Sequence, residues 1–292
     1  MGNILFIINP VAGGGKAKGL ISLIKAKMKK YKIEYSIKLT TKPKEAITIA
    51  ENSVDDYNIT VAVGGDGTIN EVARGLVNKG KGVLGIIPGG TGNDMAKSLG
   101  ISIDPVEALE HLCNGGKNSI DIGDVNNLTF FNIASIGFDG EVLRNTITIK
   151  KIIKSRFAYG ISVIYSLFSF KKKKIQINID GKIIDEDVIL VAVGNGKYYG
   201  GGMKILPEAK VDDGYLDICV ISKIGKIKLL FLFPSIFKGK HIRYTKYVKT
   251  YKGRNIKITA EDGVYLNMDG EINPKVKDIE FKLKNEKLNV IN

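Results

Sequence analysis

Alternation of strand-like and helix-like segments over the first 124 residues limits the fold more than any other feature of the sequence. Short apolar runs at 3–8, 59–63 and 83–87 are separated by stretches in which apolar residues recur at helical spacing, as in 20–28. Strands that alternate with helices build a mainly parallel sheet with helices on both faces. The sequence therefore predicts an α/β, Rossmann-like domain over residues 1–124.

The sequence changes character after this first domain, because short β-type runs punctuated by glycine replace the alternation. Two of these runs are joined by Asp180-Gly181, a pair typical of a tight hairpin turn. A second, mostly β domain, of the β-sandwich type, is therefore expected over residues 125–283. The last strand, at about 284–292, is expected to return to the first domain.

Three glycine-rich clusters each follow a predicted strand of the first domain, where an open parallel sheet binds its ligand. They read NPVAGGGK at 9–16, GGDGTINE at 64–71 and PGGTGND at 88–94. The first matches neither the dinucleotide fingerprint nor the P-loop pattern, because Ala17 follows its Gly-Lys pair, and alone it could be read as a flexible turn. Glycines let backbone amides approach a ligand, and helix N-termini attract anions, so the three clusters together predict a phosphate-binding site.

Two aspartates within these clusters are candidate metal ligands. Asp66 lies among amides that would bind phosphate, and its carboxylate would repel that ligand unless a divalent cation lay between them, so Asp66 is predicted to hold Mg²⁺. Asp94 begins a predicted helix, where an ordinary N-cap is the alternative. The only two histidines, His111 and His241, make a Ser-His-Asp triad or a His-metal centre unexpected.

The chain is strongly basic, with 44 Lys and Arg against 30 Asp and Glu. A field of this sign attracts polyanions, but no helix-turn-helix, zinc-finger or RNP-like pattern is present, so nucleic acid is not an expected partner. Cys113 and Cys219 cannot build a disulfide framework. The longest uncharged stretch, 157–170, is shorter than the roughly 20 residues of a membrane span, and a cytoplasmic protein is expected.

In their order along the chain, the three clusters resemble the catalytic domain shared by diacylglycerol kinases, sphingosine kinases and the soluble bacterial lipid kinases. The resemblance continues through short motifs at 120–123, 137–139, 200–202, 213–217 and 268–271. It implies an α/β domain of the NAD kinase and diacylglycerol kinase type, a β-sandwich domain, and phosphoryl transfer from ATP to a lipid hydroxyl, with diacylglycerol as the first candidate. A sphingoid base, another glycerolipid, an NAD kinase-like reaction and a lipid-binding protein without turnover stay open as alternatives.

The resemblance also assigns roles to individual residues. It implies that the nucleotide is surrounded by Asn9, Pro10, Val11, Ala12, Gly13, Thr40, Gly65, Asp66, Gly67, Thr68, Ile69, Asn70, Glu71 and Thr91. It implies an acidic network around a catalytic Mg²⁺ made of Asp66, Asp94 and Asp121, whose mutual repulsion would be costly without a cation. A second, structural Mg²⁺ is implied at Lys210, Asp213 and Tyr215, with backbone carbonyls from Lys210 and Tyr215.

Glu271 is implied by the same resemblance to be the general base that takes the proton from the acceptor hydroxyl, with Asp66 as the second catalytic residue. Without the resemblance, the alternative for Glu271 is a solvated carboxylate after the Asp269-Gly270 turn. Phosphoryl transfer depends mainly on positioning and charge neutralisation, so the base is expected to be a smaller contribution than the glycine clusters and Mg²⁺.

Two apolar segments with basic flanks, 157–174 and 224–246, have the composition of surfaces that contact an anionic bilayer. Each nearby Lys or Arg contributes about 1 kcal/mol to such contact. The alternative is that both are core helices with solvated lysines at their ends. The first interpretation predicts a cytoplasmic enzyme that reaches its lipid substrate by peripheral contact with the inner face of the membrane, and a homodimer is left open.

Overall fold

The structure is a computed structural model that describes residues 3–152, 165, 166, 169, 170 and 172–292. Most of the apolar segment 157–170 therefore lies outside the described residues. The helices and strands of the first lobe are β1 (Ile4–Ile8), η1 (Ala12–Gly15), α1 (Lys16–Gly19), α2 (Ile21–Tyr31), β2 (Tyr35–Leu39), α3 (Glu45–Glu51), β3 (Ile59–Gly64), α4 (Asp66–Lys79), β4 (Val83–Pro88), α5 (Asp94–Ser98), α6 (Pro105–Asn114) and β5 (Lys117–Val125).

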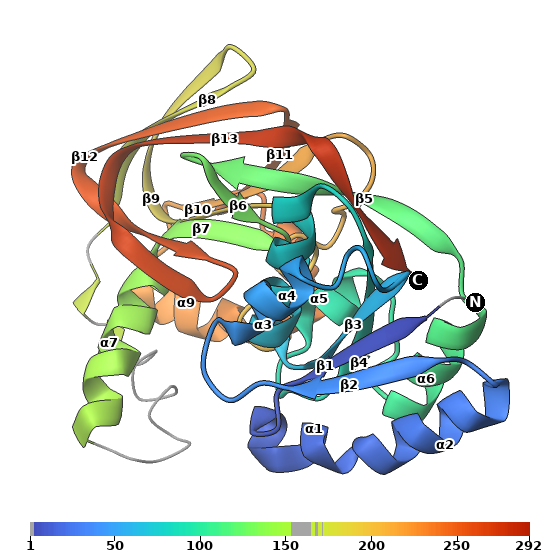
Figure 1. The fold of residues 1–292 in the computed structure, drawn as a ribbon. Coiled ribbons are helices and arrows are strands. Elements are labelled where there is room, and N and C mark those ends of the chain that lie inside the picture. Colours follow the sequence, from blue (N-terminus) through green and yellow to red (C-terminus); the bar gives the residue numbers. More distant parts are fainter. Residues whose placement is uncertain (1–2, 153–164, 167–168, 171) are drawn as a thin grey trace.

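The first lobe is built on a parallel sheet with the strand order β4-β3-β1-β2. All residues of β1 and β3 are buried, as expected for central strands covered on both faces. Helices α2 and α6 lie on one side of this sheet, and α3 and α4 lie on the other (Figure 1). The structure therefore has the α/β arrangement that the alternating pattern predicts.

The second lobe is mostly β. It contains β6 (Leu128–Phe130), β7 (Ile133–Gly137), α7 (Phe138–Ile152), β8 (Lys173–Ile179), β9 (Lys182–Gly194), β10 (Leu216–Ser222), α9 (Lys226–Leu232), η2 (Phe233–Lys238), η3 (Lys240–Arg243), β11 (Val248–Gly253), β12 (Asn255–Met268) and β13 (Glu271–Ile291). The hairpin predicted at Asp180-Gly181 is confirmed, since β8 and β9 pair antiparallel and both turn residues have positive φ.

The last strand, β13, connects the two lobes. Its first part pairs antiparallel with β12, and near its end Asn289 lies opposite Val83 of the parallel strand β4. Leu288, Val290 and other residues near the C-terminus therefore join the hydrophobic core of the first lobe. Figure 1 shows β13 running from the second lobe to the edge of the first. Within the described ranges, no helix combines the length and apolar character needed to span a bilayer.

Candidate active site

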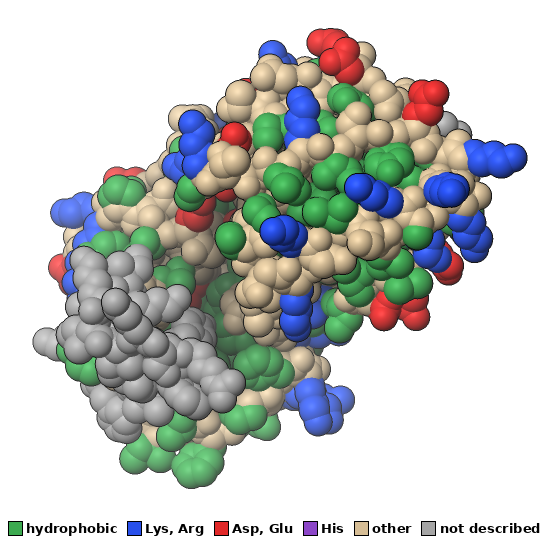
Figure 2. Space-filling model, turned by 60° about the horizontal axis from the view of Figure 1, so that its bottom comes forward, with side chains coloured by type: hydrophobic (Ala, Val, Ile, Leu, Met, Phe, Trp, Pro, Cys, Tyr) green, Lys and Arg blue, Asp and Glu red, His purple; other side chains and the backbone are tan. Residues whose placement is uncertain are grey.

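A cleft of about 280 Å³ lies where the two lobes meet, at the ends of β3 and β4. It is lined by Asp66, Asn70, Gly92, Asp94, Met95, Asn132, Ile133, Tyr199, Gly200, Gly201, Asp269 and Gly270. The space-filling view in Figure 2 shows the face of the molecule hollowed between its two lobes. The second and third glycine clusters thus share one cleft with residues more than 100 positions further along the chain.

The three glycine clusters touch one another through their backbones, which explains why glycine is required there. A Cβ on Gly13 would lie 2.3 Å from the carbonyl oxygen of Gly89, and Gly13 has a positive φ of 59°. A Cβ on Gly90 would lie 2.3 Å from the Cα of Gly65. No side chain fits at such distances, so the glycines allow three strand ends to converge on one point.

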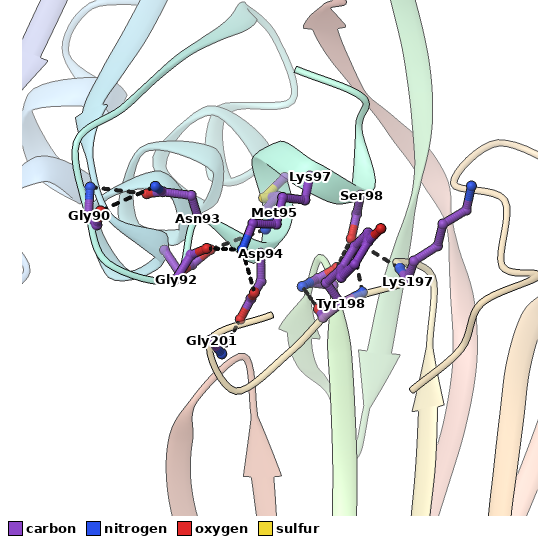
Figure 3. Close-up of polar contacts among 12 residues, drawn as sticks. Gly90, Gly92, Asn93, Asp94, Met95, Lys97, Ser98, Lys197, Tyr198 and Gly201 are labelled. Carbon is purple, nitrogen blue, oxygen red and sulfur yellow. Dashed lines mark hydrogen bonds and ion pairs between the residues drawn. The ribbon is translucent and has the colours of Figure 1, made fainter. Parts of the chain in front are cut away.

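Asp66 and Asp94 lie against the same glycine in the cleft. A Cβ on Gly92 would be 2.8 Å from Oδ2 of Asp66 and 3.5 Å from Oδ2 of Asp94. Oδ1 of Asp66 accepts a hydrogen bond from the backbone N–H of Met95 at 3.1 Å, and Oδ2 of Asp94 accepts one from Gly201 at 2.7 Å (Figure 3). Two carboxylates from different helices therefore share this part of the cleft.

Asp94 has an unusual environment for a carboxylate. Its side chain is buried, its Oδ1 has no hydrogen-bond partner among the described residues, and Nζ of Lys97 is 3.9 Å from that oxygen. Burial raises the pKa of Asp94, the N–H of Gly201 opposes that shift, and the charge of Asp66 adds to it. A buried carboxylate oxygen without a partner, beside a second carboxylate, suits a divalent cation bound by oxygen ligands.

The N-cap alternative for Asp94 does not describe its contacts. Asp94 is the first residue of α5, and the residue before it, Asn93, occupies the cap position. Asn93 uses its Oδ1 to accept the N–H of Gly90, which closes the glycine loop (Figure 3). The Asp94 carboxylate instead reaches across to Gly201 in the second lobe.

Asp121 does not line the cleft with the other two carboxylates, and its place in the three-acid network stays a prediction. It lies in β5, where Oδ1 is 2.8 Å from Nζ of Lys287 and Oδ2 accepts the N–H of Gly214 at 2.7 Å. Asp121 is absent from the cleft lining, and no group of three acidic, His or Cys side chains among the described residues is arranged to hold a metal ion. β5 carries Asp121 to the β13 side because β5 and β13 pair antiparallel.

The loop predicted to hold a structural Mg²⁺ already contains a cation from the protein. Oδ2 of Asp213 is 2.6 Å from Nζ of Lys252, and Oδ1 of Asp213 accepts the N–H of Tyr215 at 3.2 Å. The same ammonium is 3.4 Å from Oδ2 of Asp217, and Lys252 lies directly opposite Asp217 in the β10–β11 pair. Both oxygens of Asp213 therefore have partners within the chain, and the structural Mg²⁺ at Lys210, Asp213 and Tyr215 stays a prediction.

The first cluster follows the end of β1, and its neighbour Thr40 follows the end of β2. Neither lines the cleft. Asn9 accepts the N–H of Val11 through Oδ1 at 3.2 Å, and the side chain of Val11 is 76% exposed. Pro10, Ala12 and Gly13 complete the turn into η1. Thr40 is buried, and its N–H is bonded to the carbonyl of Ile8. This segment presents an open backbone turn next to the third cluster, which suits a phosphate or ribose neighbour more than a deep pocket.

The second cluster divides into residues facing the cleft and residues used for packing. Asp66 and Asn70 line the cleft, and Gly65 and Gly67 are the cap and second residue of α4. Ile69 is fully buried in the core, and Thr68 packs beneath Gly64. Glu71 accepts the N–H groups of Lys44 and Ala46 and thereby caps α3. In the third cluster, Thr91 is exposed beside the cleft. The polar atoms of Glu71 are therefore already occupied by the fold.

Glu271 stands at the rim of the cleft, directly after its lining residues Asp269 and Gly270. It is exposed and is the first residue of β13, after a turn in which Asp269 and Gly270 both have positive φ. Asp269 itself accepts hydrogen bonds from the N–H groups of three consecutive residues, Phe131, Asn132 and Ile133. Burial raises the pKa of Asp269 to about 6, against the effect of these donors.

A second, apolar cavity of about 40 Å³ adjoins the cleft. Tyr199 lines both spaces, and the cavity wall is otherwise made of Phe138, Asp139, Val142, Ile189, Leu190, Met203, Ile221, Leu229, Phe233 and Ile236. Its one acidic member, Asp139, is buried and satisfied by Gly140 and Asn267. The cavity reaches α9 and η2, so an apolar path leads from these elements toward the cleft.

Several residues of the cleft were not singled out from the sequence. Ser98 accepts the N–H groups of Lys197 and Tyr198 and donates to Asn132, which fastens the second-lobe loop to α5 (Figure 3). Asp269 lies two residues before the predicted base, but the sequence analysis assigned it no function. The only sequence signal for these contacts was the presence of short motifs in the second half, since each bond joins segments that are far apart along the chain.

The fold and the cleft define a kinase, in which amide-rich glycine loops for phosphate face a pair of carboxylates suited to a cation. Comparison with known proteins identifies the kind of kinase. Residues 3–125 match the family model "Diacylglycerol kinase catalytic domain", and residues 132–292 match "YegS C-terminal NAD kinase beta sandwich-like domain". The chain belongs to the diacylglycerol kinase catalytic-domain family and is a lipid kinase, as the resemblance predicted.

Individual relatives agree with this assignment. A diacylglycerol kinase of Staphylococcus saprophyticus is 31% identical over 280 residues, which cover 95% of this chain and 92% of the relative. A diacylglycerol kinase of Staphylococcus aureus is 32% identical over 272 residues, with 92% and 86% covered.

Solved structures support the fold. A diacylglycerol kinase from Bacillus anthracis has a TM-score of 0.76 at 23% identity, with 99% of this chain and 96% of that chain covered. An NAD kinase from Archaeoglobus fulgidus, solved with ATP, has a TM-score of 0.51 at 15% identity, with 100% and 94% covered. The α/β lobe followed by a β-sandwich lobe, as predicted from the sequence, is therefore confirmed.

Proposed function

We propose that this enzyme transfers the γ-phosphoryl group of ATP to the free hydroxyl of diacylglycerol and so makes phosphatidic acid. The observation that carries the proposal is the meeting of Asp66 and Asp94 against Gly92, where the glycine clusters converge and the second lobe closes the cleft. The relatives that match over nearly the whole chain bear the name diacylglycerol kinase, which supports this acceptor over a sphingoid base or NAD.

Asp66 and Asp94 are the residues of this chain that would hold Mg²⁺. When bound, the cation would neutralise charge on the β- and γ-phosphates during transfer. Backbone amides of the glycine clusters would orient the phosphates, and the N-terminus of α4, which begins at Asp66, adds a favourable dipole. Two of the three predicted acids, Asp66 and Asp94, line the cleft, and Asp121 pairs with Lys287.

Glu271 is the proposed general base. Its exposed carboxylate at the cleft rim would take the proton of the lipid hydroxyl while the oxygen forms its bond to the γ-phosphorus, and the bond between that phosphorus and the bridging oxygen breaks to release ADP. The tight Asp269-Gly270 turn holds the head of β13 beside the cleft. A base of this type typically contributes about 10²–10⁴-fold to the rate.

The acyl chains of the substrate would enter through the apolar cavity beneath α9 and η2. This cavity shares Tyr199 with the cleft, so the glycerol hydroxyl could reach the phosphate while hydrocarbon stays among Leu229, Phe233 and Ile236. At about 40 Å³ the cavity holds little hydrocarbon, so the chains would have to displace surrounding side chains or remain partly in the membrane.

Contact with an anionic membrane is proposed for the surface of α9, η2 and η3. Ile227 and Phe231 are 73% and 76% exposed, so this segment is not a buried core helix throughout. No Asp or Glu occurs between Asp217 and Glu261, whereas Lys and Arg recur over this stretch. Exposed apolar side chains with basic neighbours favour peripheral binding to anionic lipid at the inner membrane face.

The test is transfer of labelled γ-phosphate from ATP in mixed micelles that contain diacylglycerol, sphingosine or another glycerolipid, with NAD as a soluble control. Labelled phosphatidic acid, lost in Glu271→Gln, supports the proposal. Labelling of sphingosine in preference to diacylglycerol would change the acceptor, and labelling of NAD alone would overturn the proposal of a lipid acceptor.

A further inference from the structure

Asp269 makes more hydrogen bonds than any role as a turn residue requires. Its Oδ1 accepts the N–H groups of Asn132 and Ile133, each at 3.0 Å. Its Oδ2 accepts the N–H of Phe131 at 2.8 Å and Nδ2 of Asn70 at 2.7 Å. Four donors saturate the two oxygens, and three of them come from the segment that leads into β7. The turn before Glu271 is therefore fastened to the second lobe by the backbone and to the first lobe by Asn70.

Asn70 provides the link from the first lobe, and its polar atoms are both in use. Nδ2 donates to Asp269, and Oδ1 accepts a hydrogen bond from Nη2 of Arg74 at 3.1 Å. Asn70 and Arg74 are one turn apart on α4, the helix that begins at Asp66. The chain Arg74, Asn70, Asp269 thus runs from the phosphate-binding helix to the turn that precedes the proposed base. These two bonds fix the orientation of the Asn70 amide and use one of its two N–H donors and one lone pair of its oxygen.

We infer that Asn70 and Asp269 are positioning residues that hold the Glu271 turn against α4, so that the base and the phosphate-binding helix keep a fixed relation. The role of Glu271 in this inference rests on the proposed lipid kinase reaction. The contact between the lobes does not depend on that reaction, because it is a hydrogen bond between two residues 199 positions apart in the sequence. Reactions that depend on the placement of two groups lose rate when those groups move by as little as about 1 Å.

The first experiment separates positioning from nucleotide binding. Asn70→Ala is expected to lower kcat by about 10–100-fold and to leave the Kd of ATP, measured by calorimetry, within about twofold of wild type. Asn78→Ala is the matched control. Asn78 lies on the same helix but does not line the cleft, and its Nδ2 donates a hydrogen bond of 2.6 Å to the Glu51 carboxylate. It is expected to change neither quantity. A loss of ATP affinity in Asn70→Ala that accounts for its loss of rate would overturn the inference and make Asn70 a nucleotide ligand.

The second experiment tests whether the two residues act as one unit. Asn70→Ala combined with Asp269→Asn is expected to be no slower than Asp269→Asn alone, because a link that is already broken cannot be broken again. Rate losses that multiply would show independent roles and contradict the inference.

Hydrogen exchange keeps the inference testable if no lipid is phosphorylated or if Asp269→Asn fails to fold. In Asn70→Ala, the backbone amides of residues 131–133 and 269–272 are expected to exchange at least about 10-fold faster than in wild type and in Asn78→Ala. Unchanged exchange would contradict the positioning role of Asn70 and Asp269 even in an active enzyme. Faster exchange in an enzyme that labels no lipid would support the link between Asn70 and Asp269 and overturn only the proposed reaction.

Discussion

Two pairs of aspartates in this molecule stand in opposite relation to positive charge. In the cleft, Asp66 and Asp94 lie against Gly92, and Oδ1 of Asp94 is buried without a hydrogen-bond partner. At the β10–β11 edge, Asp213 and Asp217 share the ammonium of Lys252, at 2.6 and 3.4 Å. The second pair shares one ammonium of the chain, whereas in the first pair Nζ of Lys97 is 3.9 Å from Oδ1 of Asp94.

The difference shows why a bound metal is a better-supported prediction at Asp66 and Asp94 than at Asp213. Lys252 reaches Asp213 because β-sheet register places it opposite Asp217. In the cleft, Lys97 is tied to the carbonyl of Gly92 at 2.7 Å and stays 3.9 Å from Asp94. A carboxylate pair that shares a close ammonium has little to gain from Mg²⁺, whereas a buried carboxylate beside a second one, with its nearest ammonium at 3.9 Å, has more to gain.

The largest effect is expected from Asp66→Asn. Loss of one of the two charges that attract the cation should lower the rate of phosphoryl transfer by about 10³-fold or more, because charge neutralisation carries most of this reaction. Initial rates in mixed micelles measure the effect. A rate within tenfold of wild type would mean that the cleft pair does not hold the catalytic cation.

A smaller loss is expected from Glu271→Gln, at about 10²–10³-fold in kcat, because general-base assistance is a lesser contribution to phosphoryl transfer. The affinity for ATP should not change, since Glu271 lies at the rim rather than among the glycine clusters. Calorimetry of ATP binding beside the rate assay checks both statements. Weakened ATP binding with an unchanged rate would contradict the role of a base.

Lys252→Met tests the neutralised pair. With the ammonium gone, Asp213 and the buried Asp217 would repel each other, and the melting temperature should fall by about 2–4 °C. Lys257→Met, which removes an exposed pair with Glu280, is the control and should change it little. The melting temperatures of both variants are compared in the Asp66→Asn background, so that a cation bound in the cleft does not contribute to them.

Mg²⁺ sharpens this comparison further. In Asp66→Asn alone, added Mg²⁺ should leave the melting temperature unchanged, whereas in Asp66→Asn with Lys252→Met it should restore part of the loss. If Mg²⁺ stabilises Asp66→Asn and Asp213→Asn abolishes that stabilisation, the loop binds a metal despite Lys252.

The smallest effect concerns the pH dependence of Asp94. Burial raises its pKa, so the stability associated with its protonated form is present below the pKa of the unfolded chain and is lost as pH rises through the raised value. In EDTA near neutral pH, Asp94→Asn should therefore melt about 1–3 °C above wild type, and the difference should shrink toward acidic pH. A variant that melts lower than wild type at every pH would show that the carboxylate stabilises the metal-free fold.

Much of the fold and part of the site followed from sequence because local patterns encode them. Fully buried strands and glycine clusters placed the cleft at the ends of β3 and β4, and Asp66 and Asp94 lie in it. The contacts of Asp121 could not be predicted, because its neighbours come from β13, through Lys287, and from the loop at Gly214. Sheet register over such separations is not visible in one sequence.

The roles of Lys252 and Asp269 were hidden for the same physical reason. Each has partners that are set by strand pairing or by the meeting of two lobes, and the motif at 268–271 does not reveal the partners of Asp269. Asn70 shows the reverse case, in which a motif residue assigned to the nucleotide has its amide used within the fold.

The measurement that tests the central claim most directly is the rate of labelled phosphatidic acid formation from diacylglycerol as a function of Mg²⁺, in wild type, Asp94→Asn and Asp213→Asn. The account predicts a saturable Mg²⁺ dependence in wild type and in Asp213→Asn, and almost no product in Asp94→Asn at any Mg²⁺ concentration. Equal rates in EDTA and Mg²⁺, or a Mg²⁺ dependence lost in Asp213→Asn but kept in Asp94→Asn, would contradict it.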